Sequence, residues 1–395
     1  MTLLYFADIR FPLERANGIQ TIETCHALAV RGHRVTLVVR PDTAVPPRDP
    51  YEYYGLPRHV NLTIEIAPVA GPQVARRAGY LAFAIGRALG AARADALYTR
   101  DLGVAAALLR MPRSLRAPLV YESHGYSPEV SEALPELVVT ARKPGAAKLA
   151  RLRAREARVW RGADAYVTIT EGLAGQLRTR FGDRDRLAVI PDGARQSGSP
   201  PDVRLPRADP TVGYAGHLYP WKGVDTLLES LARLPHARGL IVGGHEKEPD
   251  LQRLKDAAGR LGIAGRVTFT GQVAPSEVPQ LLRNADVLAL PNPASAISTF
   301  YTSPLKLFEY MAAGRPIVAS DLPAIREVLQ HEVTALLVPP GDAAALASAV
   351  ERLASDASLG PSLARAASAA VRGYSWERRA ERIEALLERV IAGRA

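Results

Sequence analysis

The stretch 303–320 holds the residues whose types and spacing are best suited to chemistry. Ser303 suits the N-cap of a helix, Pro304 its first position and Gly314 the position just past its end. Glu309 points from the apolar side of that helix, where a carboxylate without a hydrogen bond costs several kcal/mol. The N–H groups of a helix N-terminus bind phosphate, and a carboxylate one turn further in can bind ribose hydroxyls. The stretch therefore predicts either a nucleotide-sugar site or a core helix whose glutamate reaches a nearby arginine.

A second candidate is the loop that follows a predicted strand at 211–215. Gly216 ends that strand, and His217 and Lys222 follow among aromatic residues before the next helix. Ligands bind at the carboxyl ends of parallel strands, where these two side chains could neutralise a diphosphate. The chain has 6 lysines against 44 arginines, and one of the six is Lys306 in the first candidate stretch. The alternative is a surface loop that carries a lysine by chance.

Two residues of the first half are candidates because of their place at a strand end or a helix start. His124 follows a short buried strand and precedes Gly125, so we expect it at the carboxyl end of that strand. Gly18 follows Asn17 at a helix start, where a glycine lets backbone N–H groups approach a ligand. The alternatives are a structural histidine and a simple helix-capping turn.

Strand and helix patterns alternate along almost the whole chain, which is typical of parallel α/β sheets. Strand patterns occur at 3–6, 35–39, 96–98, 119–121, 165–169 and 187–190, and again at 211–215, 239–242, 267–270, 287–290, 317–319 and 335–338. We therefore predict an α/β protein with two doubly wound, Rossmann-like domains that face a cleft. The predicted bounds are 1–195 for the first domain, 196–210 for a linker, 211–373 for the second domain and 374–395 for a final helix that packs back on the first.

The composition is ordinary for a soluble protein with two cores: 395 residues, 47% hydrophobic and 23% charged. No run of about 18 uncharged apolar residues exists, so we expect no membrane span. The first ten residues lack the basic segment and cleavage site of a signal peptide, and we expect a cytoplasmic protein. Cys25 is the one cysteine, which excludes an internal disulfide, and no cysteine–histidine cluster suggests zinc.

The net charge of +10 is unevenly spread. Residues 1–200 hold 28 Lys and Arg against 19 Asp and Glu, and the excess is densest at 142–161. This segment could contact anionic lipid at the inner face of the membrane or an acidic acceptor, or it could be a solvated arginine-rich helix face. We expect no nucleic-acid partner, because no aromatic residues are interleaved with the basic ones. A Pro- and Tyr-rich loop at 41–58 is either a lid that faces substrate or a surface excursion.

The motifs stand in a recognisable order. They are NGI, ESHG and ADAYVTIT…IPDG in the first half, and GHLYPWKGVDTLL at 216–228, Gly243-Gly244, FTGQV at 269–273, ADVLALP at 285–291 and SPLKLFEYMAAGRPIVASD at 303–321 in the second. In these motifs the chain resembles the retaining, two-domain glycosyltransferases of family four, also called group 1, which have the GT-B fold. The resemblance covers nearly the whole chain. It implies an acceptor-binding first domain and a second domain that binds a nucleotide sugar.

By this resemblance the catalytic residues are His124, Lys222 and Glu309. Lys222 contacts the donor diphosphate, Glu309 binds the ribose, and His124 lies near the sugar. The implied donor-binding positions also include Gly18, Gly216, His217, Gln272, Val273, Thr302, Ser303, Pro304, Leu305 and Lys306. The resemblance implies that a hexose moves from a nucleoside diphosphate sugar to an acceptor hydroxyl, lipid-linked or on a saccharide, without a cofactor.

Two positions depart from the family pattern. The family often has a glutamate that handles donor-sugar hydroxyls where Tyr301 stands, so the identity of the sugar is not implied. It often has an arginine where His217 stands, which leaves Lys222 to supply more of the positive charge.

The sequence predicts no metal and no covalent nucleophile. Asp183-Arg184-Asp185 has the spacing of a metal motif but lies in a polar turn, and no second carboxylate is placed to form a glycosyl-enzyme. These features favour front-face attack with the leaving phosphate as base. A NAD-dependent oxidoreductase is disfavoured because no G-x-G-x-x-G follows the first strand. A sugar-nucleotide epimerase and a non-catalytic sugar-nucleotide binder of the same fold stay open.

Overall fold

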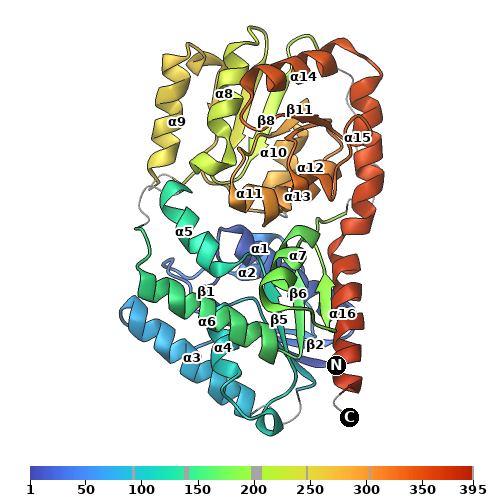
Figure 1. The fold of residues 1–395 in the computed structure, drawn as a ribbon. Helices are drawn as coiled ribbons and strands as arrows, with labels where there is room; N and C mark the ends of the chain where they lie inside the picture. The colour runs from blue at the N-terminus through green and yellow to red at the C-terminus, as the bar shows by residue number, and fades with distance from the viewer. Residues whose placement is uncertain (91–93, 138–141, 197–206, 246–247, 302–303, 394–395) are drawn as a thin grey trace. The chain divides into compact units, whose positions relative to one another are not determined.

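The chain forms two compact units (Figure 1). The computed structural model describes residues 1–90, 94–137, 142–196, 207–245, 248–301 and 304–393. The amino-terminal unit comprises Met1–Glu132, Lys143–Asp192 and Trp376–Ala395, and the carboxyl-terminal unit comprises Ala133–Arg142 and Gly193–Ser375. These bounds differ from the predicted ones at 133–142, at 193–195 and at 374–375. Residues after Asp192 group with the carboxyl-terminal unit because the Ala194 N–H donates to the Tyr374 carbonyl oxygen at 3.0 Å.

The amino-terminal unit is built on a seven-stranded parallel sheet in the order β3-β2-β1-β4-β5-β6-β7. Its strands are β1 (Thr2–Arg10), β2 (Arg34–Arg40), β3 (Leu62–Ile66), β4 (Ala96–Thr99), β5 (Leu119–Ser123), β6 (Ala165–Thr168) and β7 (Leu187–Val189). The helices of this part of the chain are α1 (Ala16–Val30), α2 (Pro50–Tyr54), α3 (Gln73–Gly90), α4 (Leu102–Leu108), α5 (Ser127–Leu137), α6 (Ala146–Gly162), α7 (Glu171–Phe181) and α16 (Trp376–Ala392).

The carboxyl-terminal unit is built on a six-stranded parallel sheet in the order β10-β9-β8-β11-β12-β13. Its strands are β8 (Thr211–Ala215), β9 (Arg238–Val242), β10 (Val267–Phe269), β11 (Val287–Leu290), β12 (Ile317–Ser320) and β13 (Leu336–Val338). Its helices are α8 (Val224–Ala232), α9 (Pro249–Arg260), α10 (Val278–Arg283), α11 (Ala296–Phe300), α12 (Leu305–Ala312), α13 (Pro323–Arg326), α14 (Ala343–Ser355) and α15 (Leu359–Ala370).

Both sheets confirm the predicted doubly wound, Rossmann-like architecture. The central strands are buried along almost their whole length, because helices cover both faces of a parallel sheet. In the register of β1, Tyr5 pairs with Leu37 on one side and Tyr98 on the other. The strand order reverses between β1 and β4 and between β8 and β11, and such reversals are where doubly wound sheets bind ligands.

Helix α16 closes the amino-terminal unit although it is the last element of the chain (red in Figure 1). Its apolar face, which includes Trp376, Ile383 and Leu387, is buried. Two of its glutamates pair with Arg31, the residue that directly follows α1: the Arg31 Nε donates to Glu384 at 2.7 Å, and its Nη1 to Glu381 at 3.2 Å. No helix among the described residues combines the length and the apolar composition that a membrane span requires.

Candidate functional site

In the carboxyl-terminal unit, the turn after β8 meets helix α12 at Gly216. The Gly216 N–H donates to the Val242 carbonyl oxygen at 2.8 Å, and its φ of +133° is one that other residues rarely adopt. A Cβ built on Gly216 would lie 3.5 Å from Lys306 Nζ. A Cβ on Gly243, at the end of β9, would overlap the Gly216 carbonyl oxygen. The two predicted glycine turns therefore pack directly on each other, beside the lysine ammonium group.

Lys306 lies in the first turn of α12 and is only 7% exposed. Its Nζ donates to the Tyr214 hydroxyl at 2.8 Å and lies 4.0 Å from the centre of that ring. The Tyr214 hydroxyl donates in turn to the His217 carbonyl oxygen at 2.6 Å. Burial and the nearby Lys222 lower the pKa of Lys306 well below its usual value, and Glu309 offsets part of this effect. This ammonium group therefore gains stability from any anion that approaches it.

Lys222 ends a short 3-10 helix, Pro220–Lys222, in the loop after β8. Its Nζ lies 3.5 Å from the centre of the Trp221 ring, and burial lowers the pKa of the amine to about 7. The loop is fixed by the Asn292 side-chain amide, which donates to the Trp221 carbonyl oxygen at 3.3 Å. Lys222 is close enough to Lys306 for its charge to lower the pKa of Lys306.

Glu309 lies one turn into α12 and is half-buried. Burial raises the pKa of its carboxyl to about 7, against the opposing effects of Lys306 and Arg195. Within the part of the chain that the structure describes, no group donates a hydrogen bond to this carboxylate or forms an ion pair with it. Arg195 acts on this carboxyl through its charge, and no ion pair between Glu309 and an arginine is found among the described contacts.

The start of α12 differs from its prediction by one residue. The helix begins at Leu305, and Pro304 occupies the N-cap with an extended backbone (φ −73°, ψ 123°) instead of the first helical position. Ser303, predicted as the N-cap, and Thr302 lie outside the described residues. Pro304 and Leu305 are both buried, so their side chains pack and only their backbone groups are suited to a ligand.

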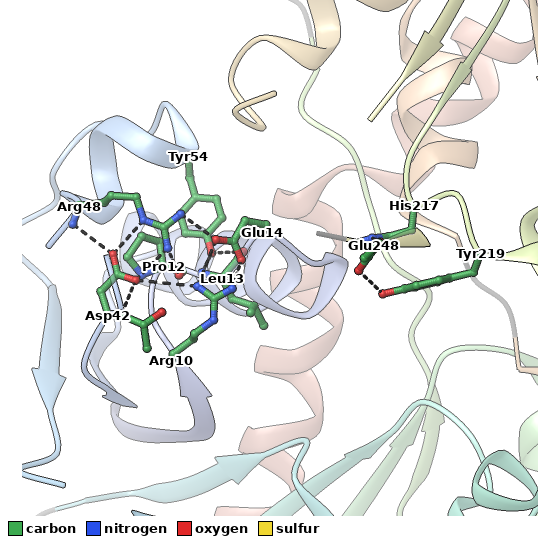
Figure 2. Close-up of polar contacts among 11 residues, drawn as sticks. Arg10, Pro12, Leu13, Glu14, Asp42, Arg48, Tyr54, His217, Tyr219 and Glu248 are labelled. Carbon is green, nitrogen blue, oxygen red and sulfur yellow. Dashed lines mark hydrogen bonds and ion pairs between the residues drawn. The ribbon is translucent and has the colours of Figure 1, made fainter. Parts of the chain in front are cut away.

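His217 has a carboxylate partner of its own (Figure 2). Its ring stacks on Tyr219, with ring centres 5.1 Å apart and planes 6° from parallel. Its Nδ1 lies 3.9 Å from Glu248 Oε2, while the Tyr219 hydroxyl donates to Glu248 Oε1 at 2.8 Å. Charge on this histidine would thus be partly neutralised by Glu248, and Lys222 is the better source of positive charge in this loop.

Gln272 and Val273 follow β10 beside the same glycine turn. The Gly243 N–H donates to the Gly271 carbonyl oxygen at 3.1 Å, which places this segment next to Gly216. Gln272 is exposed, and Val273 packs against the hydrophobic core. Gln272 is therefore the one of the two whose side chain is available to a ligand.

Gly18 lies in the first turn of α1, where the preceding loop leaves no room for a side chain. A Cβ at this position would overlap both the Leu13 carbonyl oxygen and the Tyr54 hydroxyl. That hydroxyl donates to the Leu13 carbonyl oxygen and accepts from the Leu13 N–H, each at 2.7 Å (Figure 2). Close packing thus accounts for this glycine without a ligand, and its phosphate contact stays a prediction.

The loop 41–58 supports the segment that precedes α1 (Figure 2). Arg48 donates to Asp42 at 2.8 Å, to Glu14 at 2.8 Å and to the Pro12 carbonyl oxygen at 2.9 Å. Burial alone would raise the pKa of Asp42, but its hydrogen bonds with Arg48 hold it well below its usual range. The predicted loop also contains a short helix, α2, so of the two interpretations the described contacts favour a packed surface segment over a free lid.

His124 directly follows β5, as predicted, and is bound to a buried glutamate. Glu122 is 0% exposed, and its carboxylate accepts four hydrogen bonds. Oε1 accepts from Gln20 Nε2 at 2.6 Å and from His124 Nε2 at 2.6 Å. Oε2 accepts from the Tyr98 hydroxyl and from Arg379 Nη2 at 2.6 Å. The predicted histidine is thus one member of a buried polar cluster.

The charged groups of this cluster determine the protonation states of Glu122 and His124. Burial alone would raise the pKa of Glu122, but Arg379, His124 and Arg100 outweigh burial and hold that pKa well below its usual range. Burial and Arg100 lower the pKa of His124, against Glu122 and Asp192, which raise it. Near pH 7 the cluster therefore contains an ionised Glu122 and a neutral imidazole.

Glu122, His124 and Asp192 have the ligand types of a metal site, with one ligand atom each within 4.8 Å of one another. Arg379 already lies against both carboxylates, with Nη2 2.6 Å from Glu122 and Nη1 3.9 Å from Asp192. A guanidinium in this position repels a further cation, so the donor set does not fit a metal ion.

Sequence reasoning missed Glu122 and Arg379, although both carry a signal. Glu122 is a carboxylate inside a buried strand pattern, the same anomaly that singled out Glu309 in its helix. Arg379 falls on the apolar side of α16, three residues after Trp376 and four before Ile383. Each anomaly predicts a buried partner, but their separation of 257 residues hides which partner it is.

The two halves of the chain match two different protein-family models. The model of "Glycosyl transferase 4-like domain" matches residues 18–193, and that of "Glycosyl transferases group 1" matches residues 209–356. A D-inositol 3-phosphate glycosyltransferase from Nocardia farcinica is 30% identical over 67% of this chain and 60% of that protein. A phosphatidyl-myo-inositol mannosyltransferase from Mycobacterium leprae is 35% identical over 51% of this chain and 53% of that protein. The chain thus spans between half and two thirds of the length of these relatives.

Among solved structures, a sucrose-phosphate synthase from Thermosynechococcus elongatus matches over 100% of both chains with a TM-score of 0.78. At 20% sequence identity this similarity shows the fold and nothing finer. The two family models cover both units, and the fold agrees with them. The resemblance expected from the motifs is thereby confirmed: the chain belongs to the group 1 glycosyltransferases, with a 4-like amino-terminal domain and the GT-B fold.

Proposed function

We propose that this protein transfers a sugar from a nucleoside diphosphate sugar to an acceptor hydroxyl and retains the anomeric configuration. The observation that carries the proposal is the group of Lys222, Lys306 and Glu309 in the carboxyl-terminal unit. A diphosphate beside the two lysines would offset the burial and mutual repulsion that lower the pKa of Lys306. Glu309, without a hydrogen bond from the described residues, offers acceptor oxygens to two ribose hydroxyls.

In this reaction the bond between the sugar and the distal phosphate oxygen breaks, and negative charge develops on the departing diphosphate. Lys222 and Lys306 stabilise that charge, which is the largest contribution a site of this kind makes to rate. The acceptor hydroxyl attacks from the face that the phosphate leaves and gives its proton to a phosphate oxygen. We propose that no metal takes part, since the one group of ligand-type residues found in the described chain is already neutralised by Arg379.

The acceptor we propose carries a phosphate near its reactive hydroxyl. The two relatives are named for D-inositol 3-phosphate and for phosphatidyl-myo-inositol, which share a phosphorylated polyol. An acceptor panel of inositol phosphate, phosphatidylinositol and an unphosphorylated saccharide separates the free, the lipid-linked and the sugar alternatives.

The test is product formation from a panel of UDP- and GDP-sugars with these acceptors, followed by mass spectrometry. We expect one donor to yield product, Glu309→Ala to raise the KM for that donor, and Lys255→Ala on the exposed side of α9 to behave as wild type. Full activity of Glu309→Ala would show that Glu309 does not bind the donor. If the donor is isomerised in the absence of an acceptor, the protein is a sugar-nucleotide epimerase. If it binds the nucleotide sugar without any turnover, it is a non-catalytic sugar-nucleotide binder. Loss of turnover with chelator that manganese restores would refute metal independence.

Nucleotide affinity should fall as the pH rises from 6 to 9. In the free protein Lys222 loses its proton around pH 7 because burial lowers its pKa, so binding of a diphosphate above that pH must first take up a proton. We expect the Kd of UDP or GDP to rise up to about tenfold per pH unit above pH 7. Titration calorimetry at several pH values measures this change in Kd. In Lys222→Ala only the titration of the nucleotide phosphates and of other groups remains, so we expect the Kd to depend less on pH.

A lipid-linked acceptor requires access to a membrane surface, and we propose that α6 provides it at the inner face of the cytoplasmic membrane. Arg151, Arg153, Arg155 and Arg158 of this helix are exposed. Pelleting with anionic vesicles should fall when all four become serine, because each basic residue near such a surface contributes about 1 kcal/mol. The matched control removes four exposed arginines of the other unit, Arg233, Arg238, Arg260 and Arg365. Equal pelleting of both variants, or pelleting that salt does not weaken, would contradict this location.

A further inference from the structure

We infer that Arg379, on the last helix of the chain, is a positioning residue for His124 and acts through Glu122. This inference rests on the proposed function and on the expectation, implied by the family resemblance, that His124 lies near the transferred sugar. It assigns to α16 a part in holding a sugar-binding group, in addition to its part in the hydrophobic core.

The hydrogen bonds of Glu122 determine which nitrogen of His124 carries the proton. The carboxylate is ionised and can only accept, so His124 Nε2, 2.6 Å from Oε1, must be the donor. The imidazole is neutral, which leaves the lone pair on Nδ1. No group in the described ranges bonds to Nδ1, and the His124 side chain is 21% exposed. The ring therefore presents an acceptor to a sugar hydroxyl.

Arg379 holds Glu122 in the ionised state. The arginine is 2% exposed, and its other donors are all engaged: Nη1 with the carbonyl oxygens of Ile190 at 2.7 Å and Pro191 at 2.8 Å, and Nε with Thr24 at 3.2 Å. This leaves Nη2 aimed at Glu122 Oε2. Among the groups that lower the pKa of Glu122, Arg379 has the largest effect, so the loss of this partner would raise the pKa of this fully buried carboxyl. A protonated Glu122 can donate, and the fixed tautomer of His124 would be lost.

Two other charged groups face His124 and do not replace Arg379. Arg100 is bound through Nη1 to Gln20 Oε1 at 2.7 Å, and Gln20 in turn donates to Glu122. Asp192 is buried and raises the pKa of His124, but it is not hydrogen-bonded to Glu122 among the described contacts, and Arg379 Nη1 lies 3.9 Å from its carboxylate. The ion pair with Arg379 thus makes the largest contribution among the described groups that keep the glutamate charged.

The experiment reads the tautomer directly, in the full-length protein labelled with ¹⁵N-histidine, from the imidazole ¹⁵N chemical shifts. The chain has 8 histidines, and His124→Gln assigns the signal. We expect the Nε2–H form in wild type. In Glu122→Gln, Arg379 holds the amide oxygen on its side, so the amide nitrogen faces His124 and Gln20. Gln20 must then turn its own amide oxygen toward this nitrogen, whose second N–H donates to His124 Nε2. We expect this variant to show the Nδ1–H form. Arg379→Met should shift toward a mixture, and Arg379→Lys, which keeps the charge, should restore the Nε2–H form in large part.

The kinetic consequence should appear in turnover and not in nucleotide binding. We expect kcat to fall about tenfold in Glu122→Gln and Arg379→Met, the equivalent of one lost hydrogen bond, with an unchanged Kd for UDP or GDP. Arg31→Met, which removes the contacts of α16 with the residue after α1, should keep both the tautomer and the kcat of wild type. An unchanged tautomer in Glu122→Gln, or an equal loss of kcat in Arg31→Met, would overturn the inference. If Arg379→Met does not fold, Glu122→Gln and Arg379→Lys decide. The tautomer is read without substrate, so a failure of the proposed transfer reaction leaves this result intact.

Discussion

Replacing Lys222 with alanine is expected to lower kcat for sugar transfer by about 10²- to 10³-fold, the loss seen when one charge-stabilising group is removed from a transition state. The amine lies against Trp221 and next to Lys306, where burial lowers its pKa to about 7. Contact with a departing diphosphate would return the proton and make the interaction strongest when the bond breaks. Initial rates at saturating donor measure the effect.

The same substitution should leave stability intact, which separates a role in chemistry from a role in folding. A base whose pKa falls on folding destabilises the folded state below its unfolded pKa of about 10.4. At pH 7 the loss of Lys222 therefore removes an unfavourable contribution, and we expect an unchanged or higher Tm. Lys255→Ala, on the exposed side of α9, is the matched control and should change neither quantity. Wild-type turnover in Lys222→Ala would show that Lys222 does not contact the diphosphate. A large fall in Tm would show that the lysine acts in folding, which contradicts the prediction.

Gly223→Ala is expected to destabilise the carboxyl-terminal unit by about 2–4 kcal/mol. Gly223 has a φ of +76°, and a Cβ there would overlap the carbonyl oxygen of Pro291, which is backbone and cannot rotate away. The substitution should also displace the preceding Lys222 and weaken binding of UDP or GDP. Urea unfolding and titration calorimetry measure the two effects.

The control for this glycine is Gly259 in α9, where a Cβ would meet nothing within 4 Å. Gly259→Ala should stabilise the protein by roughly 0.5–1 kcal/mol, because glycine is unfavourable in a helix. Equal effects of the two substitutions would show that the contact with Pro291 does not constrain the loop.

The parallel sheets could be predicted because strands buried on both faces leave continuous apolar runs, such as Leu3–Ala7 in β1. Glu309 and Lys306 could be found for a similar reason, since a charged residue on an apolar helix side is visible in the sequence. The cluster around His124 could not be found. Its members come from α1, β4, β5 and α16, and nothing in local sequence links Arg379 to Glu122.

Smaller differences have local causes. Pro304 takes the extended N-cap conformation, so α12 starts one residue later than its pattern indicates. In the sequence His217 is a candidate to help neutralise a diphosphate, but the fold places Glu248 beside it. The loop 41–58 lacks a periodic pattern, and only the folded chain reveals its ion pairs with Glu14 and its hydrogen bonds to Leu13.

The membership of α16 in the amino-terminal unit has a consequence for synthesis on the ribosome. The sheet of that unit is translated first, yet the arginine that neutralises Glu122 emerges only after the whole segment Gly193–Ser375 has been made. At a translation rate of about 5–20 residues per second, this wait is on the order of ten to forty seconds. During that time the nascent amino-terminal sheet carries an unneutralised buried acid and an uncovered apolar surface. The second unit can therefore fold to completion before the first, in reverse of their order along the chain.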